Sequence, residues 1–314
     1  MADIKKVATR ESYGNALAEL GEKYDIVVLD ADLSKSTKTD TFKKKFPERF
    51  INMGIAEQNM MSTAAGLASC GKVVFASSFA MFAAGRAFEQ IRNSICYPNL
   101  NVKIGATHAG ISVGEDGATH QCLEDIGIMR TIPNMVVINP ADDVEARAAV
   151  KAAILHDGPV YLRFGRLAVP VLYDEADYNF EIGKGVLLED GTDVTLVATG
   201  LMVEMALEAK KLLAQDGINA RVINIHTIKP IDREILVKAA KETGAIVTCE
   251  EHNIIGGLGS AVAEVLCEES PVPMERIGVK DSFGKSGVPS DLFKDYDLTP
   301  EAIVKAAKKV AAKK

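Results

Sequence analysis

The sequence lacks an excess of positive charge. Its 314 residues hold 36 Lys and Arg against 43 Asp and Glu, which gives a net charge of −7. Proteins that bind nucleic acids or anionic membranes need clustered positive charge, so the composition argues against both classes of partner. Apolar residues make up 47% of the chain, as in ordinary globular proteins. At ~150 residues per domain, the length predicts two domains.

The chain also lacks paired cysteines and an apolar leader. None of its five cysteines lies in a C-x-x-C spacing, so the sequence gives no support for a zinc site or a redox pair. Their odd number and wide spacing favour free thiols in a reducing compartment. The first residues hold no apolar core of the kind found in secretory signals, so we expect a cytoplasmic protein.

Long apolar runs are lacking as well. A membrane helix needs about 20 continuous apolar residues. The stretch from Gln58 to Gly85 comes nearest, with Lys72 as its only charge, but Gly71, Lys72 and several Ser and Thr divide it into two segments. We therefore interpret it as protein interior or subunit interface, and we expect no membrane partner.

What is present is an alternation of β-rich runs with helical patterns, which predicts an α/β fold with mostly parallel sheets. Several strands are almost wholly apolar, as strands covered on both faces must be. In the first part of the chain the expected strands are 26–32, 72–79, 101–106, 135–139 and 160–164, and the expected helices are 10–23, 56–69, 82–96, 121–130 and 143–156.

A polar segment rich in Gly, Pro and Asp interrupts this alternation and predicts a linker. We place one domain at residues 1–170, the linker at 171–185 and a second α/β domain at 186–314. In the second domain the expected strands are 194–199, 221–226 and 245–250, and the expected helices are 202–215, 232–243, 258–269 and one from about 299.

The segment richest in chemically active side chains is 107–121, directly after an expected strand. It holds His108 and His120, two of the five histidines, with two carboxylates and three glycines. A loop at the carboxyl end of a strand is where α/β sheets bind ligands. Paired histidines hold hydroxyl groups or move protons near neutral pH. A surface loop with ordinary turn chemistry is the alternative interpretation.

Other candidates carry weaker signals. Glu57 falls in the first turn of an otherwise uncharged helix, where the helix dipole alone favours a carboxylate and where apolar surroundings mark a candidate functional acid. Phe79 and Phe82 lie one helical turn apart, which also fits a hydrophobic core. Arg163 ends an apolar strand, a position from which a guanidinium binds phosphate or carboxylate.

Three motifs resemble transketolase. They are Leu29-Asp-Ala-Asp-Leu-Ser34, Ile55-Ala-Glu-Gln-Asn59 and Thr107-His-Ala-Gly-Ile-Ser-Val-Gly-Glu-Asp-Gly-Ala-Thr-His-Gln121. The third motif is highly specific, and the similarity covers essentially the whole chain, as in the C-terminal section of a transketolase encoded as two chains. The resemblance implies a pyrimidine-binding domain with a parallel sheet, followed by a transketolase C-terminal domain.

The resemblance also implies the cofactor site. Glu57 matches the glutamate that bonds the N1′ nitrogen of thiamine diphosphate and so helps to remove the thiazolium C2 proton. The cofactor acts as an electron sink. Phe79 and Phe82 match aromatic residues on the pyrimidine ring, and Asp32 matches a carboxylate beside the cofactor. The family's third aromatic residue falls at Gly85, where this sequence departs from the pattern.

Substrate contacts follow from the same matches. His120 is implied both as a hydroxyl-binding group and as a catalytic proton-transfer group. The implied substrate-binding residues are Arg10, Ser36 and Arg163 at the phosphate, and His108, Asp116 and His120 at the hydroxyl groups.

The sequence lacks the family's Gly-Asp-Gly motif with its downstream Asn, which holds the diphosphate and Mg²⁺. The resemblance therefore implies no metal ligands on this chain. It implies instead a partner chain, the N-terminal section, which carries the Mg²⁺ site. The implied assembly has two copies of each chain (α2β2), with self-contact and with sites between subunits. The uncharged 58–85 stretch fits such an interface.

The favoured function is transfer of a two-carbon ketol unit between sugar phosphates, as in pentose phosphate metabolism. A deoxyxylulose-phosphate synthase and the beta subunit of a 2-oxo acid dehydrogenase would share the cofactor and resemble the chain in length or fold. The two histidines around Gly114-Glu-Asp-Gly117 fit transketolase better. A noncatalytic scaffold or regulatory partner is a further alternative, although a scaffold has no need for Glu57.

Overall fold

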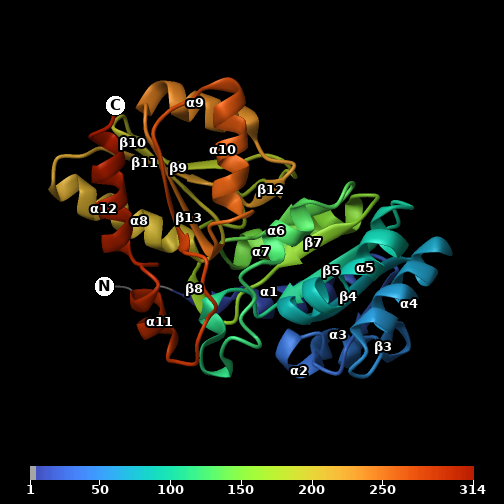
Figure 1. Cartoon of the computed structure of the whole chain (residues 1–314). Coiled ribbons are helices and arrows are strands. Elements are labelled where there is room, and N and C mark those ends of the chain that lie inside the picture. The colour runs from blue at the N-terminus through green and yellow to red at the C-terminus, as the bar shows by residue number, and fades with distance from the viewer. Residues whose placement is uncertain (1–4) are drawn as a thin grey trace.

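The computed structural model describes residues 5–314, which form two large β-sheets with helices packed on their faces and one two-stranded sheet (Figure 1). The first sheet has the strand order β12-β6-β7-β5-β4-β2-β3. Its neighbouring strands are parallel, except for β12 at one edge. The strands are β2 (Ile26–Asp30), β3 (Phe50–Asn52), β4 (Val73–Phe79), β5 (Val102–Thr107), β6 (Val136–Ile138), β7 (Val160–Arg163) and β12 (Thr227–Lys229).

Helices cover this sheet on both faces, so alternate residues of one strand belong to different cores. In β4, Val74 and Ala76 belong to the core under α4, whereas Phe75 belongs to the core under α1 and α7. The helices are α1 (Thr9–Leu20), α2 (Ser34–Thr37), α3 (Asp40–Lys45), α4 (Glu57–Ser69), α5 (Phe88–Gln90), α6 (Asp125–Arg130) and α7 (Asp143–Leu155). Short 3₁₀ segments lie at η1 (Pro47–Arg49) and η4 (Ile111–Asp116).

The second sheet has the strand order β14-β13-β10-β11-β9, with β9 antiparallel to β11 and the other pairs parallel. Its strands are β9 (Val186–Glu189), β10 (Val194–Ala198), β11 (Ala220–Asn224), β13 (Ile246–Asn253) and β14 (Met274–Val279). Its helices are α8 (Met202–Gln215), α9 (Arg233–Thr243), α10 (Leu258–Glu269), α11 (Pro289–Asp295) and α12 (Pro300–Ala311).

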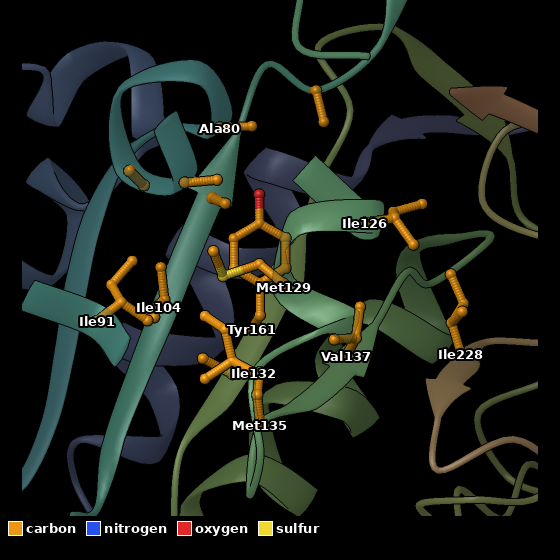
Figure 2. Close-up of a cluster of buried hydrophobic side chains, with 14 of the residues drawn as sticks. Ala80, Ile91, Ile104, Ile126, Met129, Ile132, Met135, Val137, Tyr161 and Ile228 are labelled. Atoms are coloured by element: carbon orange, nitrogen blue, oxygen red, sulfur yellow. The ribbon is translucent and has the colours of Figure 1, made fainter. Parts of the chain in front are cut away.

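Two strand pairings join parts of the chain that are distant in sequence. β1 (Lys6–Ala8) pairs antiparallel with β8 (Ala168–Pro170). β12 belongs to the second half of the chain in sequence, but it pairs antiparallel with β6 and forms the outer strand of the first sheet. Figure 1 shows β12 between the two domains. Figure 2 shows Ile228 of β12 in the same buried cluster as Ile126 and Val137.

The sequence prediction of two α/β domains with parallel sheets is confirmed. The expected division at residues 171–185, which carry no helix or strand, stays a prediction. β12 qualifies that division, because a strand from beyond residue 186 belongs to the first sheet. The segment expected to be helical at 82–96 is helical, but it is not one regular α-helix: it consists of the π-helical turns η2 (Met81–Arg86) and η3 (Ile91–Cys96) around the short α5.

The 58–85 stretch, whose only charge is Lys72, forms most of α4, then β4 and part of η2. One side of α4 is buried through Met60, Met61 and Ala64, whereas Gln58 and Asn59 are exposed. Within residues 5–314, no helix is long and apolar enough to cross a membrane.

Candidate active site

The 107–121 loop leaves the carboxyl end of β5. Its two ends are held together, because Ala109 forms a bridge to Cys122 and the Gly110 N–H donates to the Cys122 carbonyl at 2.9 Å. Ligands of open α/β sheets bind at this end of the strands, which we call the carboxyl edge of the sheet. The candidate residues that the loop carries are His108, Asp116 and His120.

His108 lies at the centre of this edge. Its buried ring stacks on Phe79, with ring centroids 3.8 Å apart and an interplanar angle of 24°. Its Nε2 lies 3.0 Å from Nη1 of Arg10, and its Nδ1 lies 2.9 Å from the Thr107 hydroxyl. A guanidinium only donates, so Nε2 accepts and Nδ1 carries the proton. Burial, with help from the Arg10 and Arg166 cations, lowers the pKa of His108 to about 3, so the ring is neutral.

Arg10 reaches the same edge from the first turn of α1. Its Nη1 also donates to the Ser36 carbonyl at 3.1 Å, so it connects the turn after β2 with the loop after β5. Its Nε is shielded from solvent and has no hydrogen-bond partner within residues 5–314. A guanidinium with an unused, shielded donor is a suitable anion-binding group.

The turn that carries Asp32 and Ser36 is shaped by Asp30, the last residue of β2. The buried Asp30 carboxylate accepts one backbone N–H and two threonine hydroxyls, at 2.6, 2.7 and 2.9 Å. Burial raises the pKa of Asp30, and these donors oppose the rise. Asp32 itself is exposed, has a φ of +65°, and accepts a hydrogen bond from Nδ2 of Asn52 at 2.9 Å.

His120 lies against an aromatic pair. The rings of Phe79 and Phe82 are stacked, with centroids 5.9 Å apart and an interplanar angle of 13°. His120 meets both rings edge-on, at centroid distances of 6.2 and 5.3 Å. Its Nδ1 lies 2.9 Å from the Thr119 hydroxyl. The aromatic pair thus orients an imidazole that solvent partly reaches.

Arg166 is a cation of this edge that the sequence patterns did not single out. Its Nη1 lies 3.5 Å from a Glu115 carboxylate oxygen and 3.7 Å from Oδ2 of Asp116. Its charge adds to the effect of burial in lowering the pKa of Arg10 and of His108, so it lies near both. The only sequence signal was its position just beyond a strand end.

Arg163 does not reach this edge. Its side chain is 3% exposed, and its Nε donates to the fully buried Asp125 at 2.8 Å. Its Nη2 donates to the carbonyls of Cys122 and Glu251 at 3.4 and 2.9 Å. Burial would lower the pKa of Arg163, but the Asp125 carboxylate outweighs it and raises that pKa. The structure therefore corrects the sequence interpretation: Arg163 is a buried structural cation, and we remove it from the expected phosphate grip.

Glu57 is the first residue of α4 and is 1% exposed. Its Oε2 accepts a hydrogen bond from Nη1 of Arg86 at 2.7 Å. The guanidinium carbon of Arg86 also lies 4.7 Å from the centre of the Phe82 ring. Arg86 thereby joins the buried acid to the aromatic pair beside His120, and it balances a charge that burial makes costly.

Gly85, the position of the missing third aromatic residue, lies in the π-helical turn η2. A Cβ at this glycine would overlap the terminal methyl group of Met81. The flexible Met81 side chain therefore takes the space beside Gly85 that a larger side chain at this position would need.

Most of the predicted site residues lie at the carboxyl edge of the first sheet, where its parallel strands end. Asp116 joins them through Arg166, Glu57 joins them through Arg86, and Asp32 lies in the neighbouring turn. In the described part of the chain, no three His, Cys, Asp or Glu side chains form a group that could hold a metal ion. The residues that lie together are Arg10, Ser36, Phe79, Phe82, His108 and His120.

Comparison with protein families accounts for both sheets. Residues 5–171 match the transketolase pyrimidine-binding domain, and residues 183–303 match the transketolase C-terminal domain. The chain belongs to the transketolase family. It corresponds to the C-terminal section of a transketolase, and its pyrimidine-binding domain implies thiamine diphosphate as cofactor.

Transketolase relatives align with nearly the whole chain. A putative transketolase C-terminal section from Methanocaldococcus jannaschii is 54% identical over 299 residues, which is 94% of each chain. A 6-deoxy-6-sulfo-D-fructose transketolase subunit from Clostridium sp. is 45% identical over 97% of this chain and 95% of the relative. A solved split-gene transketolase, described as an inactive beta4 tetramer, is 58% identical, has a TM-score of 0.92, and matches 98% of this chain and 99% of that chain.

Proposed function

We propose that this chain is the second subunit of a thiamine-diphosphate-dependent transketolase, which moves a two-carbon ketol unit from a ketose phosphate to an aldose phosphate. The observation that carries the proposal is the cluster of Arg10, neutral His108 and His120 on the Phe79–Phe82 pair. A cationic end and imidazoles suit a phosphorylated sugar with several hydroxyl groups.

The residues present fit the aminopyrimidine part of the cofactor. Glu57 supplies a buried carboxylate, and the Phe79–Phe82 pair supplies flat apolar faces beside it. When bound, thiamine diphosphate supplies an electron sink that allows a carbon–carbon bond beside a carbonyl to break. The Glu57 carboxylate, with Arg86 balancing its charge, would share a proton with a ring nitrogen of the aminopyrimidine, and the low-dielectric surroundings would strengthen that contact.

The substrate groups divide between charge and hydrogen bonding. Arg10, with its unused Nε, and the nearby Arg166 would bind the phosphate, together with Ser36. A substrate hydroxyl that donates to Nε2 of neutral His108 would replace the hydrogen bond from Arg10, because this nitrogen has a single lone pair, and Asp116 would accept a hydrogen bond from another hydroxyl. His120 is placed to transfer a proton, because its ring is partly exposed and is oriented by the aromatic pair.

We propose a partner chain that contributes the diphosphate and Mg²⁺ site, in an α2β2 assembly. The large exposed apolar residues Ile55 and Tyr97, and the uncharged exposed face of α4 with Gln58 and Asn59, support a partner surface beside Glu57. The Clostridium relative is named as a subunit, in keeping with a second chain. The free cysteines agree with a cytoplasmic site of action.

A sulfonated sugar is a second candidate substrate. Sulfonate and phosphate both present tetrahedral oxygens to a guanidinium, so Arg10 and Arg166 suit either anion. The relative named for 6-deoxy-6-sulfo-D-fructose supports this candidate. The donor of pentose phosphate metabolism remains our first choice.

The deciding experiment is co-expression with a chain that carries the Gly-Asp-Gly and Asn motif. The purified complex is assayed for ketol transfer with and without thiamine diphosphate and Mg²⁺. Phosphorylated, sulfonated and free ketoses are compared as donors. We expect turnover only with both chains and the cofactor, and a higher kcat/KM for a phosphorylated than for a free donor.

Two results would contradict the proposal. Consumption of pyruvate without ketol transfer would identify a deoxyxylulose-phosphate synthase or a 2-oxo acid dehydrogenase subunit. A stable complex whose activity is unaffected by loss of Glu57 would identify a scaffold or regulatory partner.

A further inference from the structure

The second domain contacts the 107–121 loop through one buried carboxylate. Glu251 lies in β13, is 4% exposed, and its Oε1 accepts the Ser112 N–H at 2.5 Å. Ser112 lies in η4, between His108 and Asp116. A domain to which we have assigned no ligand therefore reaches into the loop that carries the proposed sugar-binding groups.

Gly110 makes this contact possible. Its φ is +84°, and a Cβ at this position would overlap the carboxylate of Glu251. A glycine accepts the positive φ and lets the carboxylate pass its backbone and reach Ser112. The loop conformation and the Glu251 side chain are thus fitted to each other.

The position of Glu251 is itself fixed by Arg163. Nη2 of Arg163 donates to the Glu251 carbonyl at 2.9 Å, while its Nε holds Asp125. Burial raises the pKa of Glu251, and the Arg163 charge and the hydrogen bond from Ser112 oppose that rise. The buried Arg163 cation, at the end of β7, therefore holds Glu251 in a fixed position relative to Cys122, which directly follows the 107–121 loop.

Gln121 adds a second connection between the loop and the second domain. Its Nε2 lies 3.2, 3.1 and 3.0 Å from the carbonyls of Ile111, Gly114 and Lys285. Lys285 belongs to the segment between β14 and α11. Both ends of η4 are therefore connected to the second domain.

We propose that Glu251 is a positioning residue, through which the second domain sets the geometry of the substrate loop. This inference rests on the proposed function, because it assumes that His108 and Asp116 contact the sugar. Loss of the contact frees the loop, so binding of the sugar weakens. Binding of thiamine diphosphate depends on Glu57 and the aromatic pair, and it stays unchanged.

Glu250 offers a matched control on the neighbouring position of β13. Its carboxylate accepts the N–H groups of Leu258 and Gly259, at 2.7 and 2.8 Å, and so caps α10. Glu250→Ala therefore removes an equally buried carboxylate from the same strand without removing a contact to the loop. Glu251→Gln keeps an oxygen that accepts the Ser112 N–H.

The first measurement is amide hydrogen exchange of the full chain without partner or cofactor. We expect Glu251→Ala to speed exchange in peptides covering residues 108–118 by about tenfold, the effect of losing one buried hydrogen bond. Glu251→Gln restores protection, and Glu250→Ala speeds exchange around α10 only. If Glu251→Ala does not fold, Glu251→Asp, which is one methylene too short to reach Ser112, replaces it.

The second measurement uses the two-chain complex. Glu251→Ala is expected to raise KM for the ketose phosphate by about tenfold, with an unchanged Kd for thiamine diphosphate. Unchanged exchange at 108–118, equal acceleration in Glu250→Ala, or faster exchange with an unchanged KM would each overturn the proposal. The expected exchange pattern in a complex without any ketol transfer would refute the proposed function and leave the loop contact established.

Discussion

Nε2 of His108 and Nη1 of Arg10 lie 3.0 Å apart, with the imidazole accepting and the guanidinium donating. This geometry requires a neutral His108, because an imidazolium would face the arginine with a second donor. His108 follows directly after β5 and Arg10 lies in α1, so the contact connects the 107–121 loop to the start of the first domain.

Replacing Arg10 with Met tests this contact. The pKa of His108, lowered to about 3 mainly by burial and secondarily by Arg10, is expected to rise part of the way toward its usual 6.5. An NMR titration of the imidazole measures the change. In the two-chain enzyme, Arg10→Met should raise KM more for a phosphorylated donor than for the free sugar. Arg147→Met, on the remote α7, serves as control and should change neither value.

Glu57→Ala tests the proposed acid. In the reconstituted complex we expect kcat to fall by about a hundred- to ten-thousand-fold, while assembly measured by light scattering persists. Glu57→Gln should lose nearly as much, since it keeps the shape but not the proton chemistry. The exposed Glu89 on α5 gives a matched control, and Glu89→Ala should retain full turnover. Comparable activity in Glu57→Ala and Glu89→Ala would exclude a catalytic role for Glu57.

Arg163 and Arg166 form a second matched pair. Arg163→Ala leaves Asp125 buried without its cation, so the free energy of unfolding should fall by about 3–5 kcal/mol in a urea titration. Arg166→Ala should leave stability nearly unchanged and raise KM for phosphorylated donors more than for free ones. The reverse pattern, with a stable Arg163→Ala that selectively loses phosphorylated donors, would restore Arg163 to the phosphate grip.

Lys103 predicts a pH dependence of stability. Its buried Nζ donates to the His156 and Gly158 carbonyls, and burial lowers its pKa from 10.5 to about 7. Between these values the unfolded chain binds a proton that the folded chain does not, so the free energy of unfolding should rise with pH. The slope is at most about 1.4 kcal/mol per pH unit.

Urea titrations between pH 7 and 9 measure this slope, because the Cys96 thiol, with its pKa raised from 9.0 to about 12, opposes it at higher pH. Lys103→Met should flatten the slope in that window. The exposed Lys72→Met should leave it unchanged. A slope that survives in Lys103→Met would assign the effect to another group.

The longer elements could be predicted from the sequence because period and composition agree in them. The apolar runs of β2 and β4 allow only strands covered on both faces, and the spacing in α7 and α8 fits helices of ordinary length. The three-residue strands β3 and β12 carry too few residues for a pattern. The π-helical turns at 81–96 escape prediction because local spacing over one turn hardly separates them from an α-helix.

The site residues that a long motif carries, such as His108 and His120, could be predicted because the motif fixes their place on one loop. Arg163 at the end of the strand and Arg166 just beyond it could not be distinguished. Arg163 points into the protein toward Asp125. Because Asp125 lies 38 positions earlier in the chain, no local pattern reveals this pairing. Arg166 lies beyond the strand, where its direction depends on the path of the chain.

The edge strand β12 has a consequence for dividing the protein. A cut within residues 171–185 separates two stretches that look like autonomous modules, yet the amino-terminal piece would retain β6 with one side stripped of its hydrogen-bonding neighbour. Bare strand edges recruit other chains, so such a fragment should self-associate when produced alone. Genetic fission or domain exchange at this junction therefore has to carry residues 227–229 along with the first module.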